Sequence, residues 1–215
     1  MDVVIDNLPR YLSGFQLTLL LLVVSGLAAL VIGTLIAAMR ISPVASLRGF
    51  ATVYTEIVRN TPLTLVLIFC AFILPYLGSD LPYLIAAMIG LAVYTSPFVA
   101  EALRSGINGV AVGQAEAARS IGLGFAQTVG FIVFPQAFRM TVPPLINVFI
   151  ALTKNTSVAG GFFVAELFTV GKELANANGN AVIAVLLGVA TFYLVITVPL
   201  GLLAARLERK WVVQR

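Results

Sequence analysis

The sequence predicts an all-α integral membrane protein, and its composition is the first observation that does so. Of its 215 residues, 60% are apolar and only 10% are charged, whereas soluble domains carry about a quarter charged residues. So few polar side chains cannot cover a water-soluble globule. The second observation is a series of long uncharged runs, close to the roughly 20 residues that a helix needs to cross a bilayer.

Five transmembrane helices are expected from these runs. The first lies between Arg10 and Arg40, where no charged residue occurs. The second starts with Asn60-Thr61-Pro62, since proline is tolerated near a helix start. The third ends in a Tyr-Thr-Ser-Pro-Phe stretch, where Pro97 is expected to break or kink it. The expected spans are 14–39, 60–77, 83–101, 141–160 and 181–204, with a long polar loop at 102–139.

The basic residues predict how these spans are oriented. Five spans place the connector 40–59, the loop 102–139 and the tail from Arg206 to Arg215 on one side, together with ten of the thirteen lysines and arginines. This side is cytoplasmic by the positive-inside rule. The N-terminus is therefore expected outside and the C-terminus in the cytoplasm, with Trp211 at headgroup depth. Residues 77–82 and 162–180, including Glu166 and Glu173, are expected at the outer face.

The uncharged stretch 121–138 is a candidate for a sixth span. A sixth span would move the basic tail to the opposite side, against the positive-inside rule. Three glycines, at 122, 124 and 130, also disfavour a straight helix. We therefore expect a re-entrant or surface-lying helix pair, packed under the bundle as part of the cytoplasmic loop.

Composition and motifs exclude several kinds of chemistry. The chain has no histidine and a single cysteine, Cys70, which rules out histidine- or cysteine-rich metal centres and serine–histidine catalysis. It has no GxxxxGK[ST] phosphate loop and cannot be an ATPase itself. Its acidic residues are expected in loops and not as a buried pair. No catalytic or metal-binding residue is therefore expected, and the net charge of +4 is interpreted as a topology signal, not as nucleic-acid binding.

Transport, a channel and a membrane scaffold remain. No acidic ring or carbonyl filter signature for a channel is obvious. Lys154 falls inside the fourth expected span, and a charge in a membrane is costly unless it faces a cavity or a partner. This argues against a scaffold. In the polar loop, residues 113–122 form a short run of small residues with one acid and one base, suited to docking another protein.

The same loop carries a recognisable motif. Glu116-Ala117-Ala118, three further residues, Gly122 and then Ile132-Val133-Phe134-Pro135 resemble the signature of permease subunits of ATP-binding-cassette importers for polar amino acids, with Phe134 where the family usually has leucine. The match continues, in the family's order, at 59–63, 134–139, 142–147 and 154–157. It is closest to permeases of actinobacterial glutamate importers. Asn155 stands where many members have aspartate, and Val129-Gly130 where a basic residue is common.

The resemblance implies a multi-pass subunit of a bacterial cell membrane importer, with residues 1–215 as a single transmembrane permease domain. It implies a second permease, identical or related, two ATPase subunits that carry ATP and Mg, and an extracytoplasmic amino-acid-binding protein. The subunit itself would need no cofactor. The expected substrate is glutamate or a related acidic or amide amino acid. The alternative is an ion-coupled secondary amino-acid transporter or channel subunit, which would work without an ATPase.

Two sets of residues are candidates for function. The resemblance makes the short helix around Glu116 a coupling helix that docks on the ATPase. Lys154 either meets the substrate carboxylate or is a snorkelling lysine near a helix end, and Arg59, Thr61 and Pro62 either gate the path or cap a helix. The coupling residues are Glu116, Ala117, Ala118, Arg119 and Gly122; the path residues are Arg59, Thr61, Pro62, Asn147, Lys154, Asn155, Thr156 and Ser157.

Overall fold

A computed structural model of the chain describes residues 2–211, and this part is helical without a β-strand. The end of the basic tail, including Arg215, lies outside the described residues. The helical elements are α1 (Asp2–Asp6), α2 (Leu8–Arg40), α3 (Ala45–Asn60), α4 (Leu63–Ile68), η1 (Phe69–Ile73), α5 (Leu74–Tyr76), α6 (Tyr83–Asn108), α7 (Val112–Ser120), α8 (Phe125–Gln127), η2 (Thr128–Val133), α9 (Phe134–Asn155), η3 (Thr156–Phe162), α10 (Leu167–Ala177) and α11 (Val182–Trp211).

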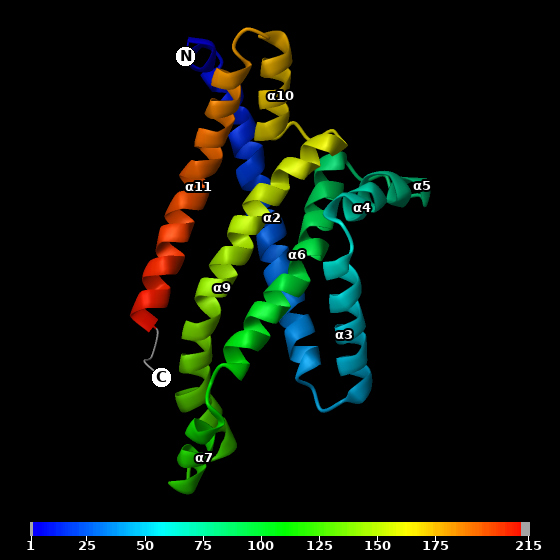
Figure 1. The fold of residues 1–215 in the computed structure, drawn as a ribbon. Helices are drawn as coiled ribbons and strands as arrows, with labels where there is room; N and C mark the ends of the chain where they lie inside the picture. Colours follow the sequence, from blue (N-terminus) through cyan, green and yellow to red (C-terminus); the bar gives the residue numbers. More distant parts are fainter. Residues whose placement is uncertain (1, 212–215) are drawn as a thin grey trace.

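Four helical segments in the described part are long and apolar enough to cross a membrane. They are Leu8–Arg40, Tyr83–Asn108, Phe125–Phe162 and Val182–Trp211, and the bent pair of Ala45–Asn60 and Leu63–Tyr76 makes up to five. Figure 1 shows α2, α6 and α9 packed as the centre of the bundle, with α11 on one side and α3 on the other. Expected spans one, three, four and five thus correspond to α2, α6, α9 and α11.

The second expected span, 60–77, is not a single helix long enough to cross a bilayer. The chain turns by 102° between α3 and the segment Leu63–Tyr76. Thr61 is extended there, at φ −90° and ψ 133°, because a residue that precedes proline is kept out of the helical region. Proline does start the next helix as expected, since Pro62 directly precedes α4. In Figure 1 α4 and α5 project sideways from the bundle.

The stretch 121–138 is not a separate helix pair, and this prediction was wrong. From Phe125 the chain runs through α8 and the π-helical η2 directly into α9, as one helical segment to Phe162. Pro135 does not end it. In a helix, proline lacks the N–H that would bond to the carbonyl four residues earlier, and its ring collides with that carbonyl. For Pro135 this is the carbonyl of Phe131. The wider π turn of η2 accommodates the missing bond and the ring. The π-helical η1 precedes Pro75 in the same way.

The core forms where the central helices cross. One cluster joins α2, α4, α6 and α9 through Leu21, Leu67, Leu91 and Leu152, and a second packs α10 against α2 and α11 around Tyr11. Gly33 of α2 allows a close crossing, because a Cβ there would lie 2.6 Å from the Ser96 carbonyl of α6. α11 is different, since only 11% of its most apolar stretch is buried. Its outer face is free to meet lipid or another subunit.

Candidate functional site

The helix α7 ends in a turn that requires glycine. The N–H of Gly122 donates to the Arg119 carbonyl at 3.0 Å, and the N–H of Leu123 donates to the Ala118 carbonyl at 3.1 Å. This pair of bonds is the Schellman arrangement, in which the residue after the helix adopts a left-handed conformation. Gly122 has φ +89°, which costs glycine little and other residues more. The glycine of the sequence motif thus closes α7 and redirects the chain toward α8.

The surface of α7 is almost entirely free. Ala118 is its only buried residue among those described, while Glu116 and Arg119 are exposed. Three apolar side chains around the helix are also strongly exposed, Val112 at 74%, Ile121 at 78% and Phe125 at 84%. Figure 1 shows α7 at one end of the molecule, beyond the ends of α6 and α9. This end therefore presents a mixed apolar and charged surface, of the kind that marks a protein contact.

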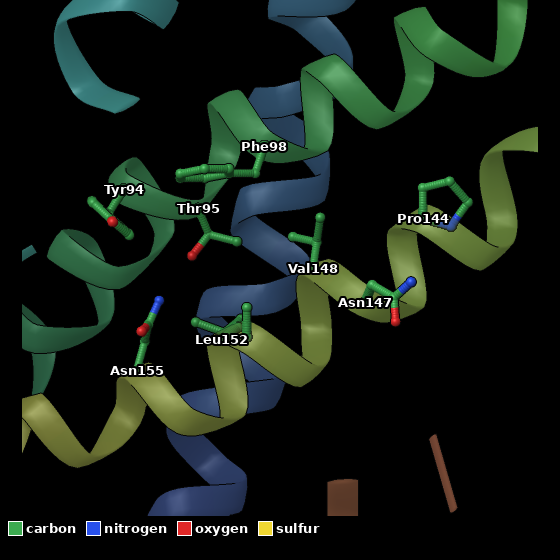
Figure 2. A pocket seen from close by; sticks show the side chains of 9 residues that line it. Tyr94, Thr95, Phe98, Pro144, Asn147, Val148, Leu152 and Asn155 are labelled. Carbon is green, nitrogen blue, oxygen red and sulfur yellow. The ribbon is translucent and has the colours of Figure 1, made fainter. Parts of the chain in front are cut away.

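A pocket of about 570 Å³ lies between α6 and α9. Figure 2 shows Thr95 of α6 and Asn155 of α9 projecting toward each other across it. The residues that line the pocket are all uncharged, and many of them are polar or aromatic: Tyr94, Thr95, Phe98, Pro144, Asn147, Val148, Ala151, Leu152 and Asn155. Such a lining offers hydrogen-bonding groups to a small polar molecule. A second cavity of 260 Å³, between α2 and α6, is lined by apolar residues alone.

One side chain in the larger pocket lacks a partner. Thr95 is 3% exposed, and its hydroxyl makes no hydrogen bond to any described residue. A buried hydroxyl without a partner costs roughly 1–3 kcal/mol. The hydroxyl oxygen is itself enclosed in the pocket wall, so a molecule in the pocket does not reach it in this arrangement.

A group of ionised side chains lies directly beside the pocket. Glu101 of α6 accepts hydrogen bonds from Arg40 of α2 and from Arg104 at 2.8 Å, and Arg59 of α3 lies 3.6 Å from the same carboxylate. The guanidinium carbon of Arg59 is 5.7 Å from the centre of the Phe98 ring, which lines the pocket. The carboxylate of Glu101 therefore joins α2, α3 and α6, and one of its partners, Arg59, contacts the pocket wall.

Comparison with known proteins identifies the family. Residues 29–213 match the family described as binding-protein-dependent transport system inner membrane component. The chain belongs to this family. It is a membrane permease subunit, as the motif around Glu116 predicts, and its apolar helices agree with a multi-pass protein of the bacterial plasma membrane.

Individual relatives cover nearly the whole permease. It is 42% identical to the glutamate transport system permease protein GluC of Corynebacterium efficiens over 96% of both chains. It is 38% identical to the probable glutamine ABC transporter permease protein GlnM of Bacillus subtilis, over 97% of this chain and 96% of that one. Among solved structures, an amino acid ABC transporter with histidines superimposes with a TM-score of 0.88, at 29% identity and 96% coverage of both chains. The MetNI methionine ABC transporter shares the fold, with a TM-score of 0.75 at 21% identity and coverage of 97% and 99%.

The structure separates the predicted path residues of the permease into two groups. Asn147 and Asn155 line the pocket, and Arg59 lies beside it. Lys154 is exposed and is not part of the lining. Three others bond to local backbone: Thr61 donates to the Ile57 carbonyl, Thr156 to the Thr153 carbonyl and Ser157 to the Lys154 carbonyl. Pro62 starts α4.

Glu166, which was expected at the outer face in a polar segment, is fully buried within the protein. Its carboxylate caps α10 by accepting the N–H groups of Phe168 and Thr169, both at 2.8 Å, and the Tyr193 hydroxyl of α11 at 2.9 Å. The first N–H groups of a helix have no partner within it, and a carboxylate there also favours the helix dipole. Burial raises the pKa of Glu166 above its ordinary 4.5 despite these bonds, which lower it. The polarity of 162–180 does not reveal this internal role.

Sequence reasoning missed the contribution of α6 to the pocket. Tyr94, Thr95 and Phe98 lie in a single stretch around Pro97, which was interpreted only as the end of a span. Three consecutive hydroxyl groups inside an apolar helix, at positions 94–96, were an available signal, because polar groups at membrane depth usually face the bundle interior or a cavity. The role of Glu101 was also missed, since two of its three arginine partners come from α2 and α3.

Proposed function

We propose that this permease forms the membrane path of an ATP-driven importer for glutamate or a related acidic or amide amino acid. The similarity to GluC and GlnM supports this substrate class, because both match along nearly the full chain and are named for glutamate and glutamine. The pocket between α6 and α9 supports a small polar substrate. Its mostly apolar wall carries the amide groups of Asn147 and Asn155. Residues 1–215 act as one transmembrane permease domain.

In this proposal α7 is the coupling helix, docked on an ATPase that binds ATP and Mg. Glu116, Ala117, Ala118, Arg119 and Gly122 form or shape the contact. The free surface of α7 at one end of the bundle supports this role. α7 then lies in the cytoplasm with the C-terminus, and the N-terminus lies outside, which agrees with the distribution of basic residues.

The assembly would contain two permeases, two ATPase subunits and an extracytoplasmic amino-acid-binding protein. The largely exposed apolar stretch of α11 leaves surface for a second permease or for lipid. ATP-driven closure of the ATPase pair would move α7 and, through it, α6 and α9, which line the pocket. α7 and the helices that it moves would then alternate between two states, and ATP bound to the ATPase would shift the equilibrium between them.

The test is uptake of radiolabelled glutamate by cells with and without this gene, in competition with glutamine and arginine. We expect uptake that depends on ATP, with glutamate or glutamine competing and arginine failing to compete. Uptake that continues without the ATPase would favour the ion-coupled alternative. Competition by arginine alone would overturn the substrate class.

A further inference from the structure

The pocket between α6 and α9 lacks a charged residue in its wall, although the proposed cargo carries at least one carboxylate. Its lining consists of apolar, aromatic, hydroxyl and amide side chains. Moving an anion into a membrane-embedded cavity without a counter-charge is costly. If the proposed function holds, a cation close to this wall must receive the carboxylate.

Arg59 is the cation that the structure places at the wall. Its guanidinium carbon lies 5.7 Å from the centre of the Phe98 ring, and Phe98 lines the pocket. The side chain of Arg59 is 40% exposed. Lys154, which the sequence left as either a substrate contact or a snorkelling lysine, is exposed at the end of α9. Neither Lys154 nor Arg59 is among the lining residues, but within residues 2–211 Arg59 is the cation that stacks on one of them, Phe98.

Glu101 holds Arg59 near this position without using its hydrogen-bond donors. One carboxylate oxygen accepts from Arg40, and the other accepts from Arg104 at 2.8 Å and 3.1 Å. Arg59 stands 3.6 Å away, beyond the usual 2.7–3.2 Å of a hydrogen bond. A guanidinium has five N–H donors. Within residues 2–211, no N–H group of Arg59 donates a hydrogen bond to another residue.

The charges around this site do not balance. Three guanidinium groups surround one carboxylate, and the side chain of Glu101 is only 22% exposed. The side chain of Arg40 is 15% exposed, whereas those of Arg59 and Arg104 are 40% and 38% exposed, so water partly screens the excess positive charge. An arriving carboxylate would find an attractive field and a planar group that can bind it through two parallel hydrogen bonds.

We propose that Arg59 binds a carboxylate of the transported amino acid and that Glu101 is the positioning residue for Arg59. This assignment rests on the proposed function. The carboxylate can be the α-carboxylate, common to all amino acids, or the side-chain carboxylate of glutamate.

The experiment measures equilibrium binding of radiolabelled glutamate and glutamine to the detergent-solubilised complex of permease and ATPase, without the binding protein. Arg59→Gln should weaken glutamate binding about tenfold to a hundredfold, as expected for one charge-assisted interaction, and Arg59→Lys should restore part of it. Arg10→Gln is the matched control, because Arg10 lies at the far end of α2 in an exposed pair with Glu173 and should change nothing.

The two ligands identify which carboxylate is bound. An equal loss for glutamate and glutamine in Arg59→Gln assigns the α-carboxylate, and a loss for glutamate alone assigns the side-chain carboxylate. Unchanged binding of both ligands would overturn the role of Arg59 and leave the proposed function intact. A wild-type complex that neither binds nor imports either amino acid would instead overturn the proposed substrate class.

A double-mutant cycle tests the positioning role of Glu101. Glu101→Gln should weaken glutamate binding severalfold in the wild-type background and have no further effect in the Arg59→Gln background. If Glu101 were only structural, its replacement would weaken binding by the same factor in both backgrounds. That result would overturn the positioning role.

Discussion

At the scale of single residues, the most informative position is Pro97 inside α6. Proline was expected to break or kink the helix there, and it does not break it, since α6 continues to Asn108. Pro97 leaves the Val93 carbonyl without its helical donor. The Tyr54 hydroxyl of α3 donates to that carbonyl at 3.2 Å and the Ser96 hydroxyl at 2.9 Å, and the two hydroxyls lie 2.7 Å apart. A neighbouring helix thus supplies the bond that proline removes.

This arrangement predicts that Tyr54→Phe destabilises the permease. The change removes the bond to Val93 and the contact with Ser96, and should cost about 1–2 kcal/mol. Thermal unfolding in detergent would measure it. Tyr76→Phe is the matched control, because Tyr76 is 89% exposed. Equal stability of both variants would contradict the proposed repair of the helix.

Glu166 supports a second prediction at this scale. Glu166→Ala removes the acceptor of the half-buried Tyr193 hydroxyl and of the N–H groups of Phe168 and Thr169, and should cost about 2–4 kcal/mol. Glu166→Gln keeps an acceptor oxygen and should cost much less. The same unfolding measurement applies. The control is Glu173→Ala, which breaks only an exposed ion pair with Arg10 and should change the free energy of unfolding by less than about 1 kcal/mol. If Glu166→Ala changed it by as little, the buried cap would be refuted.

At the scale of elements, α7 is predictable from sequence because its features are local. Small residues give a short helix, and glycine at the position after its end gives the left-handed turn. Both occur as expected, with α7 at Val112–Ser120 and Gly122 at φ +89°. The surrounding loop is shorter than expected, since α6 extends to Asn108 and the helical segment leading to α9 begins at Phe125.

The coupling role of α7 predicts the effect of substitutions at Gly122. Gly122→Asp should leave the protein in the membrane and abolish ATP-driven uptake, because a charged side chain would stand at the docking surface. Gly122→Ala adds only a methyl group in a strained conformation, costing about 1 kcal/mol, and should retain part of the activity. Uptake and membrane abundance are measured together, and normal uptake by Gly122→Asp would reject the coupling helix.

At the scale of the whole molecule, the pocket depends on how α6 and α9 cross. Ala151 of α9 lines the cavity of about 570 Å³ and is exposed to it. Ala151→Trp should fill much of this space and reduce uptake more than about tenfold, while the complex with the ATPase still assembles. Val31→Trp on α2, at a position that is 62% exposed, is the control and should retain uptake. Unimpaired uptake by Ala151→Trp would place the path elsewhere.

The sequence by itself determined the membrane class, the family and four of the apolar spans, because hydropathy and short motifs are properties of neighbouring residues. Only the tertiary structure decided the course of the chain at its prolines. It bends by 102° between α3 and α4, yet continues through Pro97 and Pro135. Whether the chain bends or continues as a helix at a proline depends on compensation for the missing N–H, either by a distant group such as Tyr54 or by a local π turn.

The same division holds for the candidate site. Asn147 and Asn155 could be selected from sequence because their motifs are local, and both line the pocket. Phe98 and Glu101 gain their importance from partners on other helices, and Thr95 from its place opposite α9. Arg59 reaches Glu101 across 42 positions of sequence only because α3 packs against α6. Helix packing brings these groups together, and no periodicity or spacing along one segment encodes it.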